Sequence, residues 1–275
     1  MFDSKKIFFF DLDGTLLNSS KQISEETLIA LKKFTDAGNH FCINTGRAID
    51  SAKAVYRDLG LDFKGSFLCG SDGTEIYDVD NETYVYKSGV PLPAVKQIFD
   101  LSVEMDVHCH TYTESSIVTL FDDECMKYYR RVIKTPLIVT DDILREVKEP
   151  PSKILSVELH DHDKQERFRK AAEEITGGVI TTLYSNPYYL EIFPADAGKG
   201  SAVKRLADHL NIPIENTYAA GDEENDISML EAAGCSIAMI NGKDSVKKCA
   251  DIVTKLDNDH DGLAEYILGA IYAGN

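Results

Sequence analysis

One stretch of this 275-residue chain decides its fold: Ile7-Phe8-Phe9-Phe10-Asp11-Leu12-Asp13-Gly14-Thr15-Leu16-Leu17. Its first four residues are apolar and β-prone, without the alternation of a half-exposed strand. Such a run indicates a strand buried on both faces, as in a parallel sheet. Two acids and a glycine end it. We therefore expect Asp11 and Asp13 to lie at the end of a central strand.

The segments that follow alternate between helix and strand. Ser24 is a helix cap, with Glu25 and Glu26 in the first turn and Gly38 just past the end. Two more buried strands are expected over 41–44 and 66–69, with a helix over 48–59 between them. This order predicts an α/β fold with a doubly wound, mostly parallel sheet.

From about Tyr77 the pattern changes to short alternating stretches, which predict an α+β module with a largely antiparallel sheet. Its strands are expected over 83–88, 107–112, 116–121, 154–159 and 181–193, and its helices over 93–105 and 164–175. After Pro194 the α/β alternation returns. We therefore predict a core of residues 1–77 and 191–275, interrupted by an inserted cap domain of residues 78–190.

The composition limits the partners. The chain has 29 Lys and Arg against 46 Asp and Glu, a net charge of -17. Nucleic acids and anionic membranes bind mainly through basic side chains, so neither is expected as a partner. The six cysteines include no Cys-x-x-Cys pair, and no apolar run approaches the length of a membrane span. A cytoplasmic location is expected, and the oligomeric state stays open.

Four polar segments follow core strands or open core helices: residues 11–15, 44–47, 198–201 and 221–226. The carboxyl ends of parallel strands share one edge, where ligands bind. Acids such as Asp11 and Asp222 there need a countercharge, and Mg2+ prefers carboxylate oxygens. Thr45 and Lys199 are suited to hold a phosphate. Each segment alone also has a plainer explanation, such as a solvated turn, a helix cap or an exposed lysine.

In this order the segments resemble the motifs of the haloacid-dehalogenase-like (HAD) hydrolase superfamily, in particular its Cof-type phosphatases with a class IIB cap. The matching motifs are Asp11-Leu12-Asp13-Gly14-Thr15-Leu16, then Thr45-Gly46-Arg47, then Lys199, then Gly221-Asp222 with Asn225-Asp226-Ile227. The resemblance implies a HAD-like Rossmannoid core and a cap that sets substrate specificity. It also implies a Mg2+-dependent phosphatase acting on small phosphorylated metabolites, such as sugar phosphates.

Roles for individual residues come from the same resemblance. It implies that Asp11 attacks phosphorus to form an aspartyl-phosphate, and that Asp13 is the general acid and base. The implied metal-binding residues are Asp11, Asp13 through its carbonyl, Asp222 and, through metal-bound water, Asp226. The implied phosphate-binding residues are Leu12, Thr45, Gly46, Lys199 and Asn225. Asp72 departs from the pattern, because it stands where Asn is usual, and it has no assigned role.

Other interpretations stay open. A phosphomutase of the same superfamily shares the Asp-x-Asp chemistry but returns the phosphoryl group to its substrate. A non-catalytic metal- or phosphate-binding module is a further alternative, which the complete set of motif residues argues against. The pair His108 and His110 is expected to be part of an ordinary strand rather than a metal site. Tyr184, Tyr188 and Tyr189 are equally suited to packing and to substrate contact.

Overall fold

The computed structural model describes residues 5–131 and 133–272, which form two compact units. The first unit is the chain up to Lys87 and from Gly198 onward, and the second is Ser88–Ala197. The boundaries expected at 77/78 and 190/191 therefore need correction. Strands β4 (Glu75–Asp78) and β5 (Thr83–Lys87) form a hairpin that extends the sheet of the first unit, and β11 (Tyr189–Pro194) belongs to the second sheet.

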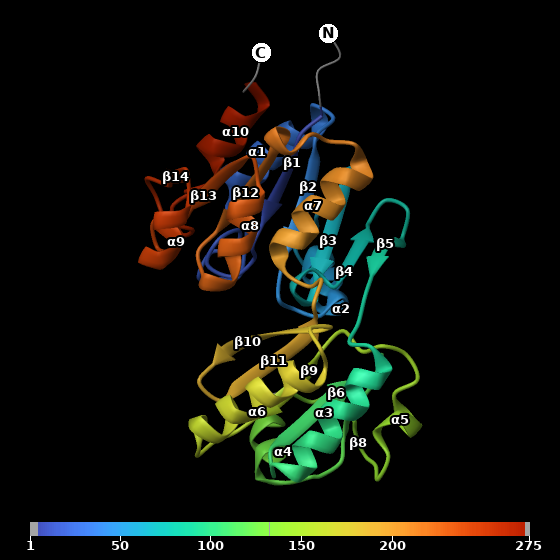
Figure 1. Ribbon diagram of the computed structural model, residues 1–275. Helices are drawn as coiled ribbons and strands as arrows, with labels where there is room; N and C mark the ends of the chain where they lie inside the picture. The colour runs from blue at the N-terminus through green and yellow to red at the C-terminus, as the bar shows by residue number, and fades with distance from the viewer. Residues whose placement is uncertain (1–4, 132, 273–275) are drawn as a thin grey trace. The chain divides into compact units, whose positions relative to one another are not determined.

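The first unit is built on an eight-stranded sheet of order β14-β13-β12-β1-β2-β3-β4-β5 (Figure 1). Its remaining strands are β1 (Ile7–Phe10), β2 (His40–Asn44), β3 (Ser66–Gly70), β12 (Thr217–Gly221), β13 (Cys235–Ala238) and β14 (Ile252–Val253). These six are parallel, β4 is antiparallel to its neighbour β3, and β5 is antiparallel to β4. The predicted mostly parallel α/β sheet is confirmed.

Helices cover both faces of this sheet. They are α1 (Glu25–Asp36), α2 (Ile49–Asp58), α7 (Lys199–Leu210), α8 (Ile227–Ala232), α9 (Asp244–Cys249) and α10 (Ala264–Tyr272), with 3-10 turns η1 (Ser71–Gly73), η2 (Ile214–Asn216) and η3 (Glu224–Asp226). One apolar cluster joins one sheet face to α1, α2 and α10, and another joins the other face to α7, α8 and α9. Ser24 caps α1 as predicted, because its side chain accepts from the Thr27 amide.

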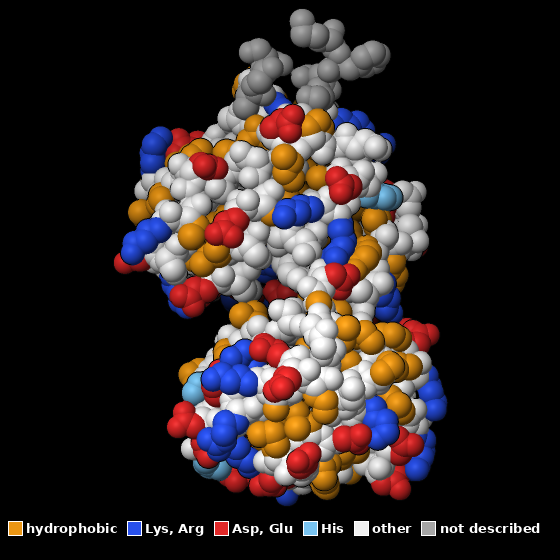
Figure 2. All heavy atoms as spheres, in the orientation of Figure 1, with side chains coloured by type: hydrophobic (Ala, Val, Ile, Leu, Met, Phe, Trp, Pro, Cys, Tyr) orange, Lys and Arg blue, Asp and Glu red, His pale blue; other side chains and the backbone are white. Residues whose placement is uncertain are grey.

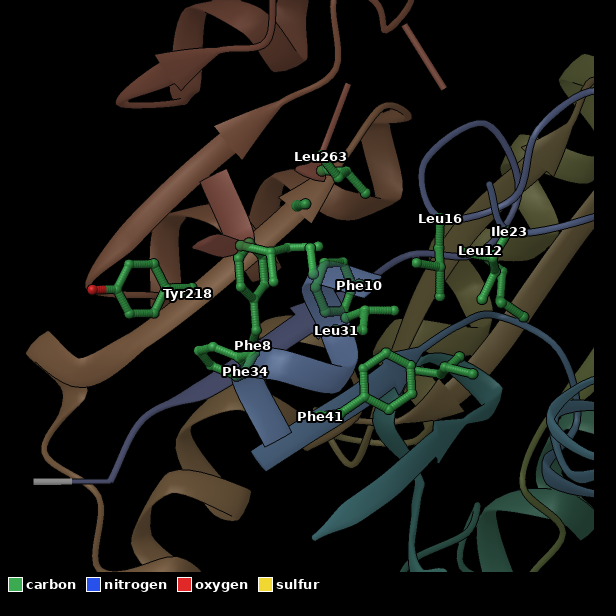
Figure 3. Close-up of a cluster of buried hydrophobic side chains, with 14 of the residues drawn as sticks. Phe8, Phe10, Leu12, Leu16, Ile23, Leu31, Phe34, Phe41, Tyr218 and Leu263 are labelled. Carbon is green, nitrogen blue, oxygen red and sulfur yellow. The ribbon is translucent and has the colours of Figure 1, made fainter. Parts of the chain in front are cut away.

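The unbroken apolar run of β1 follows from this three-layer arrangement. Successive side chains of a strand point to opposite faces. Phe8 and Phe10 accordingly lie in the cluster with α1 and α10, whereas Ile7 and Phe9 lie in the cluster with α7 and α8. All four are fully buried, so no position of the strand can be polar. Figure 3 shows the first of these clusters.

Phe8 is the aromatic centre of that cluster, and its removal gives a prediction about stability. Its ring lies 4.2 Å from that of Phe10, 5.5 Å from that of Tyr218 and 6.1 Å from that of Phe34. Phe8→Ala should lower the free energy of unfolding by about 3–5 kcal/mol, measured by urea denaturation, because it leaves a cavity. Phe121→Ala, at a side chain that is 53% exposed, is the matched control and should change it by less than about 0.5 kcal/mol. Equal losses in the two variants would contradict this account of the core.

The second unit contains a six-stranded sheet of order β10-β11-β9-β6-β7-β8. Its other strands are β6 (His108–Tyr112), β7 (Ile117–Thr119), β8 (Leu137–Val139), β9 (Ile154–Val157) and β10 (Ile180–Asn186). Its helices are α3 (Leu92–Glu104), α4 (Glu124–Tyr129), α5 (Ile143–Glu146) and α6 (His162–Ile175). The sheet is antiparallel except for the pair β7 and β8, in agreement with the predicted α+β module.

Alternate residues of β6 form a buried hydrogen-bonded chain within the second unit. His108 contacts Asp123 through Nδ1 (2.8 Å) and His110 through Nε2 (3.2 Å). His110 continues to the Tyr112 hydroxyl (3.2 Å). These groups lie in a row rather than around a point, so the chain has the form of a polar strand interior and not of a metal site.

Acidic and basic side chains are interspersed on the visible face of each unit (Figure 2). Within the described part of the chain, no helix is long and apolar enough to cross a membrane.

Candidate active site

Three parallel strands bring the polar segments of the first unit to one edge of its sheet. Strand β1 lies between β12 and β2, and Phe10 pairs with Ala220 on one side and with Ile43 on the other. The chain leaves all three strands just beyond these residues. Asp11, Thr45 and Asp222 therefore emerge at the same edge, as the strand-end argument predicts.

A buried ammonium group joins two of the acids. Lys199 is the first residue of α7 and is only 1% exposed, so it is not a solvent-exposed loop lysine. Its Nζ donates to Asp11 Oδ1 at 2.6 Å and to Asp226 Oδ1 at 2.5 Å. Charged side chains are buried in this way only when paired.

The other carboxylate oxygens of these acids differ in whether they accept a hydrogen bond. Asp226 Oδ2 accepts from the backbone amides of Asp222 (2.9 Å) and Glu223 (3.0 Å), so both oxygens of Asp226 are bonded. Asp222 Oδ1 accepts from the Thr15 hydroxyl at 2.6 Å. In the described chain, no donor contacts Asp11 Oδ2 or Asp222 Oδ2, and these two oxygens remain available to a ligand.

The same acids form the candidate metal site. One carboxylate oxygen from each of Asp11, Asp222 and Asp226 can be chosen so that all three lie within 4.8 Å of one another, the only such group among the described residues. Burial, opposed by Lys199, raises the pKa of Asp11 to about 7. Burial, opposed by the Thr15 hydroxyl and reinforced by Asp226, raises the pKa of Asp222 to about 6. Three acids share one ammonium, so a divalent cation fits this donor set.

Asp13 lies in a different environment from Asp11. Its carboxylate is 41% exposed and accepts from Lys21 Nζ on one oxygen (2.7 Å) and from Arg47 Nη2 on the other (2.6 Å). Partial burial favours the neutral acid, but the bonds from Lys21 and Arg47 outweigh it and lower the pKa of Asp13. The two acids of one Asp-x-Asp motif therefore have pKa shifts of opposite sign.

Donors suited to an anion lie at the ends of β1 and β2. Thr45 is buried, and its hydroxyl oxygen accepts from the Arg47 amide at 3.3 Å. The Leu12 and Gly46 amides donate no hydrogen bond to a described residue. The half-buried Asn225 lies in η3, and its side chain makes no bond to a described residue.

Gly14 allows the two carboxylate segments to approach each other. It has a φ of +84°, and a Cβ at this position would lie 2.4 Å from Asp222 Oδ2. A side chain would therefore meet both an unfavourable backbone conformation and the carboxylate itself. Gly14 is therefore needed for the segments that follow β1 and β12 to lie in contact.

Several supporting residues were not predicted from the sequence. Thr15 and Arg47 lie inside the quoted motifs, but their bonds to Asp222 and Asp13 carry no sequence signal. Asn44, which is fully buried, donates to the Lys199 carbonyl at 3.0 Å and so fixes the start of α7. Lys21 and Asn241 come from loops; Asn241 donates to the Gly14 carbonyl at 2.8 Å.

Comparison with known proteins agrees with this geometry. A family model described as haloacid dehalogenase-like hydrolase matches residues 8–267. The 5-amino-6-(5-phospho-D-ribitylamino)uracil phosphatase YitU of Bacillus subtilis (strain 168) is 30% identical over 273 residues, which cover 94% of each chain. YwtE of the same organism has the same enzyme name and is 31% identical over 284 residues, covering 95% of this chain and 96% of the relative.

A solved structure gives the same result for the fold. A haloacid dehalogenase-like hydrolase from Bacteroides thetaiotaomicron has a TM-score of 0.80 and 30% sequence identity, and the match covers 96% of this chain and 98% of that chain. The family match includes all four polar segments predicted from the sequence, residues 11–15, 44–47, 198–201 and 221–226. The chain therefore belongs to the haloacid dehalogenase-like hydrolase family, as its motifs predicted, and is a phosphoric monoester hydrolase of that family.

Proposed function

We propose that the protein is a Mg2+-dependent phosphatase that hydrolyses small-molecule phosphomonoesters through an aspartyl-phosphate on Asp11. The observation that carries this proposal is that the carboxylates of Asp11 and Asp13 have different hydrogen-bond partners. One carboxylate oxygen of Asp11 accepts from Lys199, and the other has no donor. Asp222, which also has one oxygen without a donor, lies beside Asp11. Asp13 is held apart by Lys21 and Arg47.

In the first step, Asp11 Oδ2 attacks phosphorus and the bond to the ester oxygen breaks. Asp13 gives a proton to the leaving alcohol. It is ionised in the free protein because Lys21 and Arg47 lower its pKa. A nearby dianionic phosphate favours the neutral form of an acid, so Asp13 takes up its proton as substrate binds.

In the second step, Asp13 removes a proton from water, which attacks the aspartyl-phosphate and releases inorganic phosphate with Asp11 restored. Lys199, Thr45, Asn225 and the amides of Leu12 and Gly46 hold the phosphoryl oxygens. Positioning and charge stabilisation of this kind supply most of the catalysis in phosphoryl transfer.

For the metal, Asp11, Asp222 and the Asp13 carbonyl are the proposed ligands. Asp226 is the proposed holder of metal-bound water, since Lys199 and two amides already occupy its carboxylate. Bound Mg2+ would neutralise charge on the carboxylates and on the phosphoryl oxygens.

For the substrate, we propose a small phosphorylated metabolite, with specificity set by residues of the second unit, Ser88–Ala197. Three relatives bear the name of a phosphatase acting on 5-amino-6-(5-phospho-D-ribitylamino)uracil, a phosphorylated sugar-alcohol derivative. That compound and sugar phosphates are therefore the first substrates to examine.

Release of inorganic phosphate tests the proposal. Purified protein with Mg2+ should hydrolyse at least one compound in a panel of phosphomonoesters, without a bisphosphate activator. EDTA should lower the rate by about 100-fold or more, because the buried acids then lack their countercharge, and added Mg2+ should restore it.

Three results would reject this function. Full activity in EDTA would contradict the metal requirement, and strict dependence on a bisphosphate would favour the phosphomutase. A protein that binds Mg2+ and phosphate but hydrolyses nothing would support the non-catalytic module.

A further inference from the structure

A fourth buried acid lies beside the proposed phosphate ligands. Asp72 is 8% exposed and occupies the middle of η1. Its carboxylate oxygens lie 3.1 and 3.3 Å from the position that a Cβ on Gly46 would take. The Asp72 carboxylate therefore packs against Gly46, whose amide is a proposed ligand of the phosphoryl group.

The backbone holds Asp72 in place from two sides. Its amide donates to the Thr45 carbonyl (3.3 Å), and its carbonyl accepts from the Gly198 amide (2.6 Å). Ser71 and Asp72 both have left-handed backbone conformations, with φ of 48° and 51°. Such conformations persist only where the surrounding structure imposes them. The carboxylate is therefore fixed between the Thr45 segment and the start of α7.

Asp72 also acts on Lys199. Burial lowers the pKa of Lys199, but the charges of Asp11, Asp226 and then Asp72 outweigh it, and the pKa lies above its ordinary value. The charge of Asp72 is thus felt at the ammonium group that is proposed to hold the phosphoryl group. A negative charge at this place repels an anion and attracts a cation.

We propose that Asp72 sets, through its charge, how tightly the site binds the phosphoryl group and the divalent cation. It weakens the hold of the site on the phosphoryl group and strengthens its hold on the divalent cation. Inorganic phosphate, the product, is therefore released more readily than from a site with a neutral residue here. This inference rests on the proposed function, because it takes Gly46 and Lys199 as phosphate ligands.

Asp72→Asn tests it with little change of shape. Asn is nearly isosteric and tolerates the left-handed conformation, while one charge is removed. Calorimetric titration of the Mg2+-loaded variant with inorganic phosphate should show a Kd about tenfold lower than in the parent protein. Titration of the metal-free variant with Mg2+ should show a Kd raised by a similar factor of about ten.

Asp62→Asn is the matched control. Asp62 is exposed and precedes β3, so it belongs to the opposite edge of the sheet, and the substitution removes the same charge. Both Kd values should stay within about twofold of the parent values, because solvent and salt screen a distant exposed charge.

The Kd values for phosphate and for Mg2+ are expected to shift in opposite directions, which distinguishes the loss of a charge from a distortion of the site. A distorted site would bind both phosphate and Mg2+ more weakly, and that result would overturn the inference, as would two unchanged Kd values. Turnover of the phosphomonoester panel by the parent protein is measured alongside. Opposite shifts without any turnover would reject the hydrolysis in the proposed function but keep its phosphate and Mg2+ ligands, on which the inference rests. Turnover without the shifts would reject the inference alone.

Discussion

Asp11→Asn is expected to abolish phosphate release, with a loss in kcat of at least about 10^4-fold, the scale seen when a covalent nucleophile is removed. The Asn amide keeps the shape of the side chain but lacks the negatively charged oxygen that attacks phosphorus. Steady-state hydrolysis of the best substrate in saturating Mg2+ measures the loss. Acid-quenched protein should also carry no phosphate on residue 11.

The fold should survive this substitution. Asp11 is a buried acid whose pKa is raised to about 7, so a neutral side chain removes a desolvation cost. Lys199 keeps its partner Asp226 at 2.5 Å. A melting temperature equal to or above that of the metal-free parent is expected. Activity within tenfold of the parent would contradict the assignment of Asp11 as the nucleophile. An unfolded variant would show that Asp11 has a structural role instead.

Much of the first unit could be predicted because local pattern and topology agree there. The strands β1, β2, β3 and β12 have both faces covered, so their sequences are unbroken apolar or small-residue runs with recognisable ends. Strand β4 could not be found in this way. It contains Glu75 and Asp78, and it is fixed only by pairing with β3 and β5. The second unit therefore begins later in the chain, at Ser88, than the sequence pattern predicts.

The residues of the site that follow directly after strands could be predicted from the sequence. Asp11 and Asp222 meet because β1 and β12 are neighbours, and the rule for parallel sheets suffices. The contacts of Lys199 depend on how α7 begins, which the buried Asn44 fixes from β2. The contact of Lys21 with Asp13 depends on a left-handed loop residue with φ of 59°. Neither arrangement has a periodicity or spacing that a sequence displays.

Lys199→Met should affect activity and stability together. It removes a proposed ligand of the phosphoryl group, and kcat/KM should fall by about 10^2- to 10^3-fold. It also leaves Asp11 and Asp226 without their buried ammonium partner, at a cost of about 3–5 kcal/mol in the free energy of unfolding. Lys255→Met, at a side chain that is 75% exposed, is the matched control and should leave the free energy of unfolding almost unchanged.

The pH dependence of that cost identifies its cause. In the metal-free parent, burial raises the pKa of Asp11 to about 7 and that of Asp222 to about 6, above the value of about 4 in an unfolded chain. The folded state then binds protons more tightly, so stability present below pH about 4 is lost as the pH rises through these values. Lys199 opposes the rise at Asp11, and without it the loss at high pH is larger.

Urea denaturation of metal-free protein should therefore show a larger deficit for Lys199→Met at pH 8 than at pH 5, where protonation has already neutralised much of the carboxylate charge. Mg2+ should reduce the deficit at pH 8, because a cation replaces the missing positive charge. Met is similar to Lys in length and apolar, so packing changes little. A deficit that is equal at both pH values and indifferent to Mg2+ would show that Lys199 stabilises the protein by packing, and the charge-pairing account of this site would be wrong.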